Sequence, residues 1–326
     1  MAVTAATDMS RGRPPFVWPS RQRAASVMLL ATALIAIEFY APNFFRYHNI
    51  VNVLLQASLL SLLAIGMTIV MIVGGIDLSL PANMALGAVL GAFSMKAGAH
   101  WTVGVAIMIA TCLSVGLING FAVARLKMIP FVVTLAMMTV VSGATVWLTN
   151  SLSISQLPDA FVDLLDARPV LGVPVAVLIV AILGGFITIL MRSTVAGRWA
   201  YAVGINERAA RVARIPINRV ILASYLFSGL MAGLSAVLLT ARLGSASANM
   251  GNDGVVLDIV SACVVGGVSI YGGSGRVPGA LFGALLITVL SNAMNLIGVS
   301  YYLSLIVKGV VIVAFVAIEG RREGRQ

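Results

Sequence analysis

Residues 50–73 read IVNVLLQASLLSLLAIGMTIVMIV, a run without one charged side chain, and residues 74–79 interrupt it with GGIDLS. A helix that crosses a bilayer needs about 20 mostly apolar residues, so this run is long enough to span a membrane. The interruption joins two glycines to an acidic residue, a group that is costly in contact with lipid. This stretch therefore predicts a membrane-spanning helix that ends at a polar, glycine-rich turn.

Apolar runs of similar length fill most of the chain. Of its 326 residues 60% are hydrophobic and 10% are charged, against roughly 25% charged in a soluble domain. Such a surface needs membrane lipid around it. We therefore expect an all-α, multi-pass protein of the cell inner membrane with about ten transmembrane helices. The expected spans are 24–41, 50–73, 80–98, 101–124, 129–149, 173–191, 218–241, 254–271, 277–297 and 301–318.

Basic residues set the expected orientation of these spans. With a cytoplasmic N-terminus, the inside segments hold sixteen Lys and Arg and the outside segments hold four. Positive charge concentrates in cytoplasmic loops, so both termini are expected in the cytoplasm. The predicted organisation is a disordered tail over 1–23, a membrane domain over 24–318 and a second tail over 319–326. The longest cytoplasmic loop is 192–217.

A short internal repeat marks two of the expected helix ends. The sequence VGGIDL at 73–78 recurs in outline as VGGVSI at 265–270, and both breaks precede a new helix on the same side. This pattern predicts a parallel duplication. The motif residues are Gly74, Gly75, Asp77, Ser79, Gly266 and Gly267. The glycines alone fit close helix packing. Asp77 and Ser79 fit either caps of a helix that starts at Pro81 or a role in transport.

Several function classes are disfavoured by the sequence. The net charge of +10 does not indicate nucleic-acid binding, because the basic residues punctuate apolar runs and gather on no single face. No G-x-x-x-x-G-K-[ST] phosphate loop and no H-E-x-x-H or G-x-S-x-G motif occurs. Cys112 and Cys263 lack metal-site spacing. We therefore expect no enzyme activity, cofactor or metal in this chain.

Three motifs resemble the ribose-type permeases of ATP-binding-cassette (ABC) importers. They are GGIDLS at 74–79, AVGINERAAR at 202–211, and LDIVSACVVGGVS at 257–269 followed by GGSGR at 272–276. Their order and spacing also fit, and the resemblance extends from about residue 50 to 318. It implies the membrane permease subunit of an importer that moves a sugar or sugar-like small solute into the cytoplasm.

The resemblance also implies partners. Permeases of this family form a pair of membrane subunits, here expected to be a homodimer. They dock a cytoplasmic ABC ATPase, which hydrolyses ATP, and receive solute from an extracytoplasmic solute-binding protein. Which solute is carried cannot be read from the sequence.

The loop 192–217 is the expected contact with the ATPase. A helix beginning near Asn206 would place Ile205, Ala209 and Val212 on one side and its charged residues on the other. By resemblance this is the coupling helix, with Gly204, Asn206, Glu207, Arg208, Ala209, Ala210 and Arg211 as its residues. The simpler interpretation is a linker whose arginines enforce topology. Arg214 departs from the family, which usually has glycine before Ile215.

Polar residues inside apolar runs are candidates for the solute path, because they usually face the interior of a helix bundle. They are Asn52 and Gln56 on one helix and Thr288, Ser291, Asn292 and Asn295 on another. Hydrogen bonding between helices explains them equally well. Asp258 and Lys308 are the charges placed most clearly within apolar spans, and their expected depths allow an ion pair.

An ion-coupled secondary transporter of a small polar solute is the alternative function. Such transporters usually place ionisable groups near the middle of the membrane. Glu38, Asp77, Asp258 and Lys308 are few and mostly lie near the ends of spans. This observation favours the ABC permease.

Overall fold

The computed structural model describes residues 44–166, 173–251, 253–310 and 313. The expected tails at 1–23 and 319–326 and the expected helix at 24–41 lie outside these residues. So does part of the expected last helix at 301–318.

The described part is built from α-helices, and its only β-pairing is an isolated bridge between Ile154 and Ala246. The elements are α2 (Tyr47–Ile72), α3 (Leu80–Lys96), α4 (Trp101–Ala124), α5 (Pro130–Thr149), α6 (Asp159–Asp166), α7 (Val175–Ser193), α8 (Val195–Ile205), α9 (Glu207–Val212), α10 (Ile217–Leu243), the 3-10 turn η1 (Ala248–Gly251), α11 (Asp253–Val265) and α12 (Val277–Leu296). A further apolar helix covers Tyr301–Val310.

Seven of these described helices are long and apolar enough to cross a membrane. They include α2, α4, α5, α7, α10 and α12. The seventh is Ala248–Val265, in which the 3-10 turn η1 precedes α11. Taken as α-helices alone, α3 has 17 residues and α11 has 13, so at 1.5 Å per residue they extend about 26 and about 20 Å. Both are shorter than a hydrocarbon core of about 30 Å. The chain is therefore an all-α membrane protein in which two helices are shortened.

Helix α2 forms the centre of the bundle and the outer helices surround it. In its most apolar window 78% of residues are buried, against 22% to 28% in α4, α5 and α7. It packs against α10, α12, α11 and α7, and Leu62, Ile65 and Ile72 are completely buried. The exposed faces of α4, α5 and α7 carry apolar side chains such as Phe121, Val140 and Ile182. These outer faces are suited to lipid.

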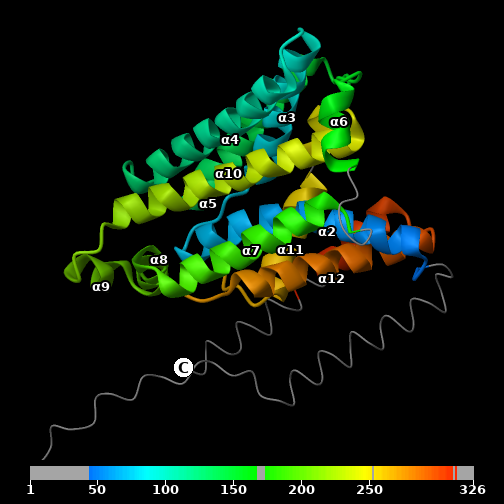
Figure 1. The fold of residues 1–326 in the computed structure, drawn as a ribbon. Coiled ribbons are helices and arrows are strands. Elements are labelled where there is room, and N and C mark those ends of the chain that lie inside the picture. The colour runs from blue at the N-terminus through cyan, green and yellow to red at the C-terminus, as the bar shows by residue number, and fades with distance from the viewer. Residues whose placement is uncertain (1–43, 167–172, 252, 311–312, 314–326) are drawn as a thin grey trace, which may run out of the picture. The chain divides into compact units, whose positions relative to one another are not determined.

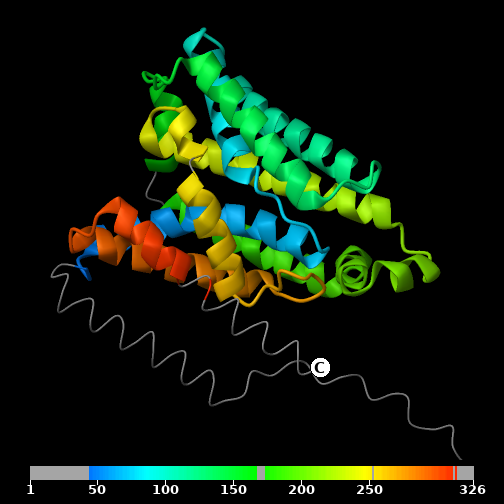
Figure 2. The same cartoon turned by 180° about the vertical axis from the view of Figure 1, so that it is seen from behind.

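Helices α4 and α10 lie side by side, and α8 and α9 lie together at the end where α7 stops and α10 begins (Figure 1). Seen from behind, a light-blue segment leaves the end of α2 and runs back between the helices to the start of α3 (Figure 2). This segment is residues 73–79, which carry the first glycine motif. Its placement explains why α3 is short.

The expected span at 254–271 is wrong at its end, because α11 stops at Val265. Gly267 has a φ of +78°, and its N–H donates to the Val264 carbonyl while the Val268 N–H donates to the Cys263 carbonyl. These two hydrogen bonds form a left-handed helix cap that ends α11. The other expected spans from 50–73 to 277–297 agree with helices to within three residues.

Candidate functional site at the glycine junction

Three of the sequence motifs meet at one place, which we call the glycine junction: Gly74, Gly204, Gly272 and Gly273. The Gly273 N–H donates to the Ile72 carbonyl over 2.9 Å. A Cβ on Gly272 would lie 2.8 Å from the Gly74 Cα and 3.1 Å from the Gly204 oxygen. The end of α2, the end of α8 and the loop between α11 and α12 are therefore in backbone contact.

Only glycine fits this arrangement. Gly74, Gly272 and Gly273 have φ values of +85°, +90° and +71°, a left-handed conformation that other residues rarely adopt. Gly204 is constrained by space instead, because a Cβ there would collide with the Ile72 carbonyl. The conformational need at Gly74, Gly272 and Gly273 and the steric need at Gly204 have the same result, a junction in which backbone packs directly on backbone.

The two copies of the repeat end their helices with the same hydrogen bonds. After α2, the Gly74 N–H donates to the Met71 carbonyl and the Gly75 N–H donates to the Val70 carbonyl. This is the cap already described after α11. The left-handed residue is the first glycine of the pair after α2 but the second, Gly267, after α11. The copies thus share a cap geometry and differ by one residue in register.

Helix α9 begins at Glu207 with Asn206 as its N-cap, close to the start that the sequence indicated. The Asn206 Oδ1 accepts from the Ala209 N–H over 3.0 Å, which caps the helix and separates α9 from α8. Arg211 donates to Glu207 over 2.8 Å, an i, i+4 pair that supports the helix. Arg208 and Ala209 are exposed.

The residues predicted to form the apolar side of α9 do not pack against the protein. Ile205 and Val212 are 72% and 86% exposed, Ala209 is also exposed, and the buried residue is Ala210. Ala210 packs with Val203 and Ile217, so α8 and α10 determine which side is covered. The apolar residues Ile205 and Val212 are left at the surface.

Arg214, which departs from the family pattern, ends α9 in a left-handed conformation with a φ of +58°. The Ile215 N–H donates to the Ala210 carbonyl and the Arg214 N–H donates to the Arg211 carbonyl. This is the cap for which helices usually use glycine. The family's preference for glycine at this position thus has a conformational explanation, and the arginine here adopts the same cap.

Behind the junction lies a buried group that we call the polar cluster: Asp77, Ser79, Asn119 and Ser228. All four side chains are at most 2% exposed. Asp77 accepts from the hydroxyls of Ser79 over 2.6 Å and Ser228 over 2.8 Å. The Asn119 amide donates to the Ser79 hydroxyl over 2.8 Å. The cluster ties the 73–79 segment to α4 and α10.

Of the two residues considered as helix caps, the structure supports one local contact. Asp77 accepts from the backbone N–H of Ser79 over 3.1 Å, whereas the Ser79 side chain makes no capping bond with α3. Asn119 and Ser228 were not among the sequence candidates. Asn119 could have been found from the sequence, because it is an isolated amide within an apolar run.

Asp258 and Lys308 lie together. The Lys308 Nζ is 2.8 Å from Asp258 Oδ1 and 3.0 Å from Oδ2. The Lys308 side chain is 9% exposed and that of Asp258 is 21% exposed. The pair joins α11 to the helix Tyr301–Val310.

The residues proposed for a solute path separate into different environments. Asn52 accepts from Arg242 of α10 over 2.7 Å, and Gln56 is half-buried on the same helix. The contact with Arg242 was not anticipated. It joins α2 to α10, as a hydrogen bond between helices does.

The stripe on α12 is similarly divided. Asn292 exchanges hydrogen bonds of 2.9 and 3.1 Å with Asn49 of α2, and Ser291 donates to the Ile287 carbonyl. Thr288 is buried, whereas Asn295 is exposed. The stripe therefore does not line one common surface.

The geometry of the glycine junction is better suited to transmitting movement between segments than to a catalytic or metal site. Among the described residues no three His, Cys, Asp or Glu side chains gather in a way that would hold a metal. What the site offers is a short surface helix whose base is packed directly on the backbone of two other segments.

Comparisons with known proteins agree with this architecture. Residues 49–316 match the family described as branched-chain amino acid transport system / permease component. The chain is 35% identical to the ribose import permease protein RbsC of Escherichia coli (strain K12), over 97% of this chain and 99% of that protein. It is 35% identical to RbsC of Bacillus subtilis (strain 168), over 92% and 94%. It is 31% identical to the L-arabinose ABC transporter permease protein AraH of Azospirillum brasilense, over 95% and 91%. No solved structure matches the chain.

Proposed function

Since the chain belongs to the permease family of ABC importers, we propose that it carries a sugar or sugar-like small solute across the inner membrane into the cytoplasm. The main observation behind this proposal is the near full-length similarity to ribose and arabinose permeases. The polar character of those solutes fits a path lined by hydroxyl and amide groups. That the solute is a sugar or sugar-like molecule is part of the proposal.

The proposed complex contains two copies of this chain, a cytoplasmic ABC ATPase and an extracytoplasmic solute-binding protein. Relatives of the chain are permease subunits, and its sequence has no phosphate loop. Hydrolysis of ATP therefore belongs to the ATPase subunit. We expect the purified chain to hydrolyse no ATP on its own.

The proposed topology has ten spans over 24–318, both termini in the cytoplasm and a parallel repeat. Two contacts support a shared side for the basic loops. Lys127 donates to Asn218 over 2.9 Å and lies 3.9 Å from Glu207, so the loop after α4 and the loop before α10 meet at one end. We call this the basic end and assign it to the cytoplasm.

We assign α9 and its flanking residues from Gly204 to Arg211 to ATPase docking. The exposed Ile205 and Val212 are apolar groups at the basic end that a partner would cover. At the base of α9, Gly204 rests against the Ile72 carbonyl and Gly273 rests against Ile205. A displacement of α9 by the ATPase would therefore reach the ends of α2 and α11.

The solute path is assigned to the interior next to the shortened helices α3 and α11. Gly251 of η1 packs on the Pro81 carbonyl, so these two interruptions of helical structure adjoin. Broken helices near the membrane midplane are common in transporter binding sites. Thr288 and Gln56 remain candidates, whereas Asn52 and Asn292 bind neighbouring helices.

The proposal is tested in vesicles that contain the permease, the ATPase and the solute-binding protein. Labelled ribose uptake should require all three components and ATP. Uptake that persists without the ATPase would overturn the ABC assignment and favour the ion-coupled transporter.

The docking role is tested separately by Arg208→Glu/Arg211→Glu, with the exposed Arg198→Glu on α8 as matched control. The double variant should lose capture of the ATPase while inserting normally, because both residues lie on the surface. Capture at wild-type level by the double variant would remove α9 from the interface.

A further inference from the structure

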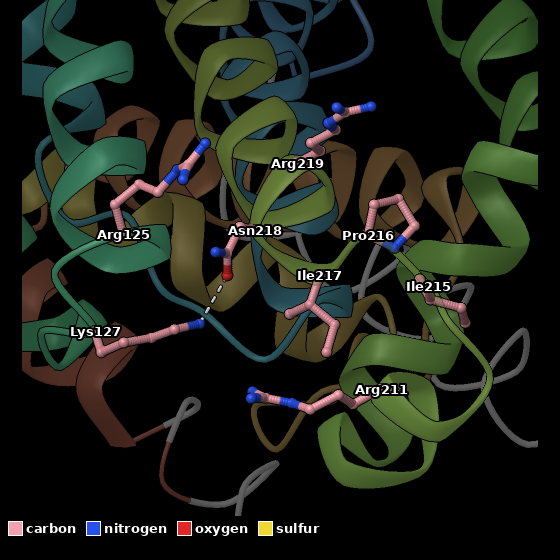
Figure 3. A pocket seen from close by; sticks show the side chains of 8 residues that line it. All are labelled: Arg125, Lys127, Arg211, Ile215, Pro216, Ile217, Asn218 and Arg219. Atoms are coloured by element: carbon pink, nitrogen blue, oxygen red, sulfur yellow. Dashed lines mark hydrogen bonds between the residues drawn. The ribbon is translucent and has the colours of Figure 1, made fainter.

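A hollow of about 370 Å³ lies at the basic end between α4, α9 and α10. Its lining includes Arg125, Lys127, Arg211, Asn218 and Arg219. Figure 3 shows Lys127 and Arg211 extending toward the same space from opposite sides, with Arg125 beside α10 and Arg219 directed away. We call this the basic hollow.

Positive charge in the basic hollow is poorly compensated. Within the described part of the chain, Glu207 is the one carboxylate that pairs with these basic residues, bound to Arg211 over 2.8 Å and 3.9 Å from Lys127. Among the described residues, no ion pair is formed by Arg125 or Arg219. The first turn of α10 adds to this field, because Pro216 at its N-cap makes no side-chain capping bond. The site is suited to an anion.

The depth of the basic hollow in the membrane follows from the chain. Helix α4 ends at Ala124 and α5 begins at Pro130, so the loop with Arg125 and Lys127 has only five residues between two membrane spans. A loop this short stays at the level of the lipid headgroups. A phosphate bound there would lie at the depth of the phospholipid headgroups.

Apolar side chains adjoin the basic ones on the same loop. Leu126, between Arg125 and Lys127, is 60% exposed, and Ile129 is 66% exposed. Phe121, one turn before the end of α4, is also exposed. These exposed apolar side chains would add nothing to the binding of an acidic protein segment. The acyl chains of a phospholipid would cover them.

We propose that the basic hollow binds the headgroup phosphate of an anionic phospholipid through the loop residues Arg125 and Lys127, with its acyl chains against Phe121, Leu126 and Ile129. Basic sites between membrane helices commonly bind such headgroups. The proposal depends on the membrane location of the chain and is independent of the transported solute and of the role of α9.

The test is native mass spectrometry of the full chain in detergent, titrated with phosphatidylglycerol or phosphatidylcholine of matched acyl chains. Each basic residue near a charged headgroup contributes about fivefold to binding. We expect wild type to prefer phosphatidylglycerol by about tenfold or more. Arg125→Gln/Lys127→Gln should bind the two lipids equally, while Arg198→Gln keeps the preference.

Three further measurements complete the test. Arg125→Gln alone removes no contact within the described residues and should lower the preference about fivefold. Leu126→Gln should weaken both lipids without changing their ratio. Millimolar inorganic phosphate should leave the bound lipid in place.

The proposal fails if wild type shows no preference, if the double variant keeps it, or if inorganic phosphate displaces the lipid. It also fails if the double variant loses capture of the ATPase but retains the lipid preference. That result would identify an acidic protein segment as the occupant.

Discussion

Asp77 and Asp258 both place a carboxylate inside the helical bundle, but their partners are of different kinds. Asp258 lies against a cation, the Lys308 ammonium at 2.8 Å. Asp77 is 2% exposed, and among the described residues its donors are neutral: the hydroxyls of Ser79 and Ser228 and one backbone N–H. The first site is a charge pair between two helices, and the second is a hydrogen-bonded turn.

The difference shows what each site requires of the fold. Removal of Asp258 leaves a buried cation without its counter-charge, whereas removal of Asp77 leaves only neutral donors without an acceptor. An unpaired buried charge costs more than an unpaired hydroxyl. The two carboxylates should therefore differ in the cost of deletion, and substitutions at four sites test how this cost depends on the partner of the deleted group.

The largest effect is expected at the charge pair. Asp258→Asn should lower the free energy of unfolding by about 3–5 kcal/mol, because Lys308 stays buried. Lys308→Met should also destabilise, and the double variant should cost clearly less than the sum of both. Thermal unfolding in detergent measures all three, with the exposed Lys96→Met as control. Additive effects would show that the two residues act independently.

Asp77→Ala should cost about 2–3 kcal/mol, since two buried hydroxyls lose their acceptor. Adding Ser228→Ala should recover part of the loss by removing one of those donors. The same thermal assay applies. A loss at Asp77 that equals the loss at Asp258 would contradict the comparison and indicate an unseen cation at the polar cluster.

Removing a neutral hydrogen-bonded pair between helices should lower the stability less than either carboxylate deletion does. Asn292→Leu removes the reciprocal amide bonds with Asn49, and such bonds in membranes average about 0.6 kcal/mol, with a maximum near 2. Asn295→Leu, on the exposed end of the same stripe, is the matched control. Equal effects at the two positions would mean that the Asn49 contact does not stabilise the bundle.

The smallest effect is expected at the surface carboxylate. Glu207→Gln removes an exposed pair with Arg211 at 2.8 Å and should cost about 0.5 kcal/mol or less. Raising the salt concentration should abolish the difference from wild type, because salt screens exposed charges. A loss of more than 1 kcal/mol that persists in high salt would assign Glu207 a structural role.

The sequence predicted the helices well because membrane spans depend on length and apolarity. The span expected at 101–124 coincides with α4, and the span at 50–73 differs from α2 by three residues at most. The pairing of Asp258 with Lys308 was predicted from their expected depths in the membrane alone. The end of α11 was missed because apolar residues continue beyond the glycine pair, and a helix cap is decided by local hydrogen bonds.

The glycine junction could not be predicted as an assembly. Backbone contacts among Ile72, Gly204 and Gly273 leave no periodic pattern in any one segment. The three motifs were visible singly, but their meeting depends on how α2, α8 and the loop after α11 pack. The outward direction of Ile205 and Val212 has the same origin.

The junction also orders the maturation of the chain. The seat for Gly204 combines Ile72 with Gly273, two residues about 200 positions apart in sequence and joined by a hydrogen bond. Ribosomes deliver Gly204 before Gly273, so the backbone seat of Gly204 is complete only after residue 273 has been synthesised.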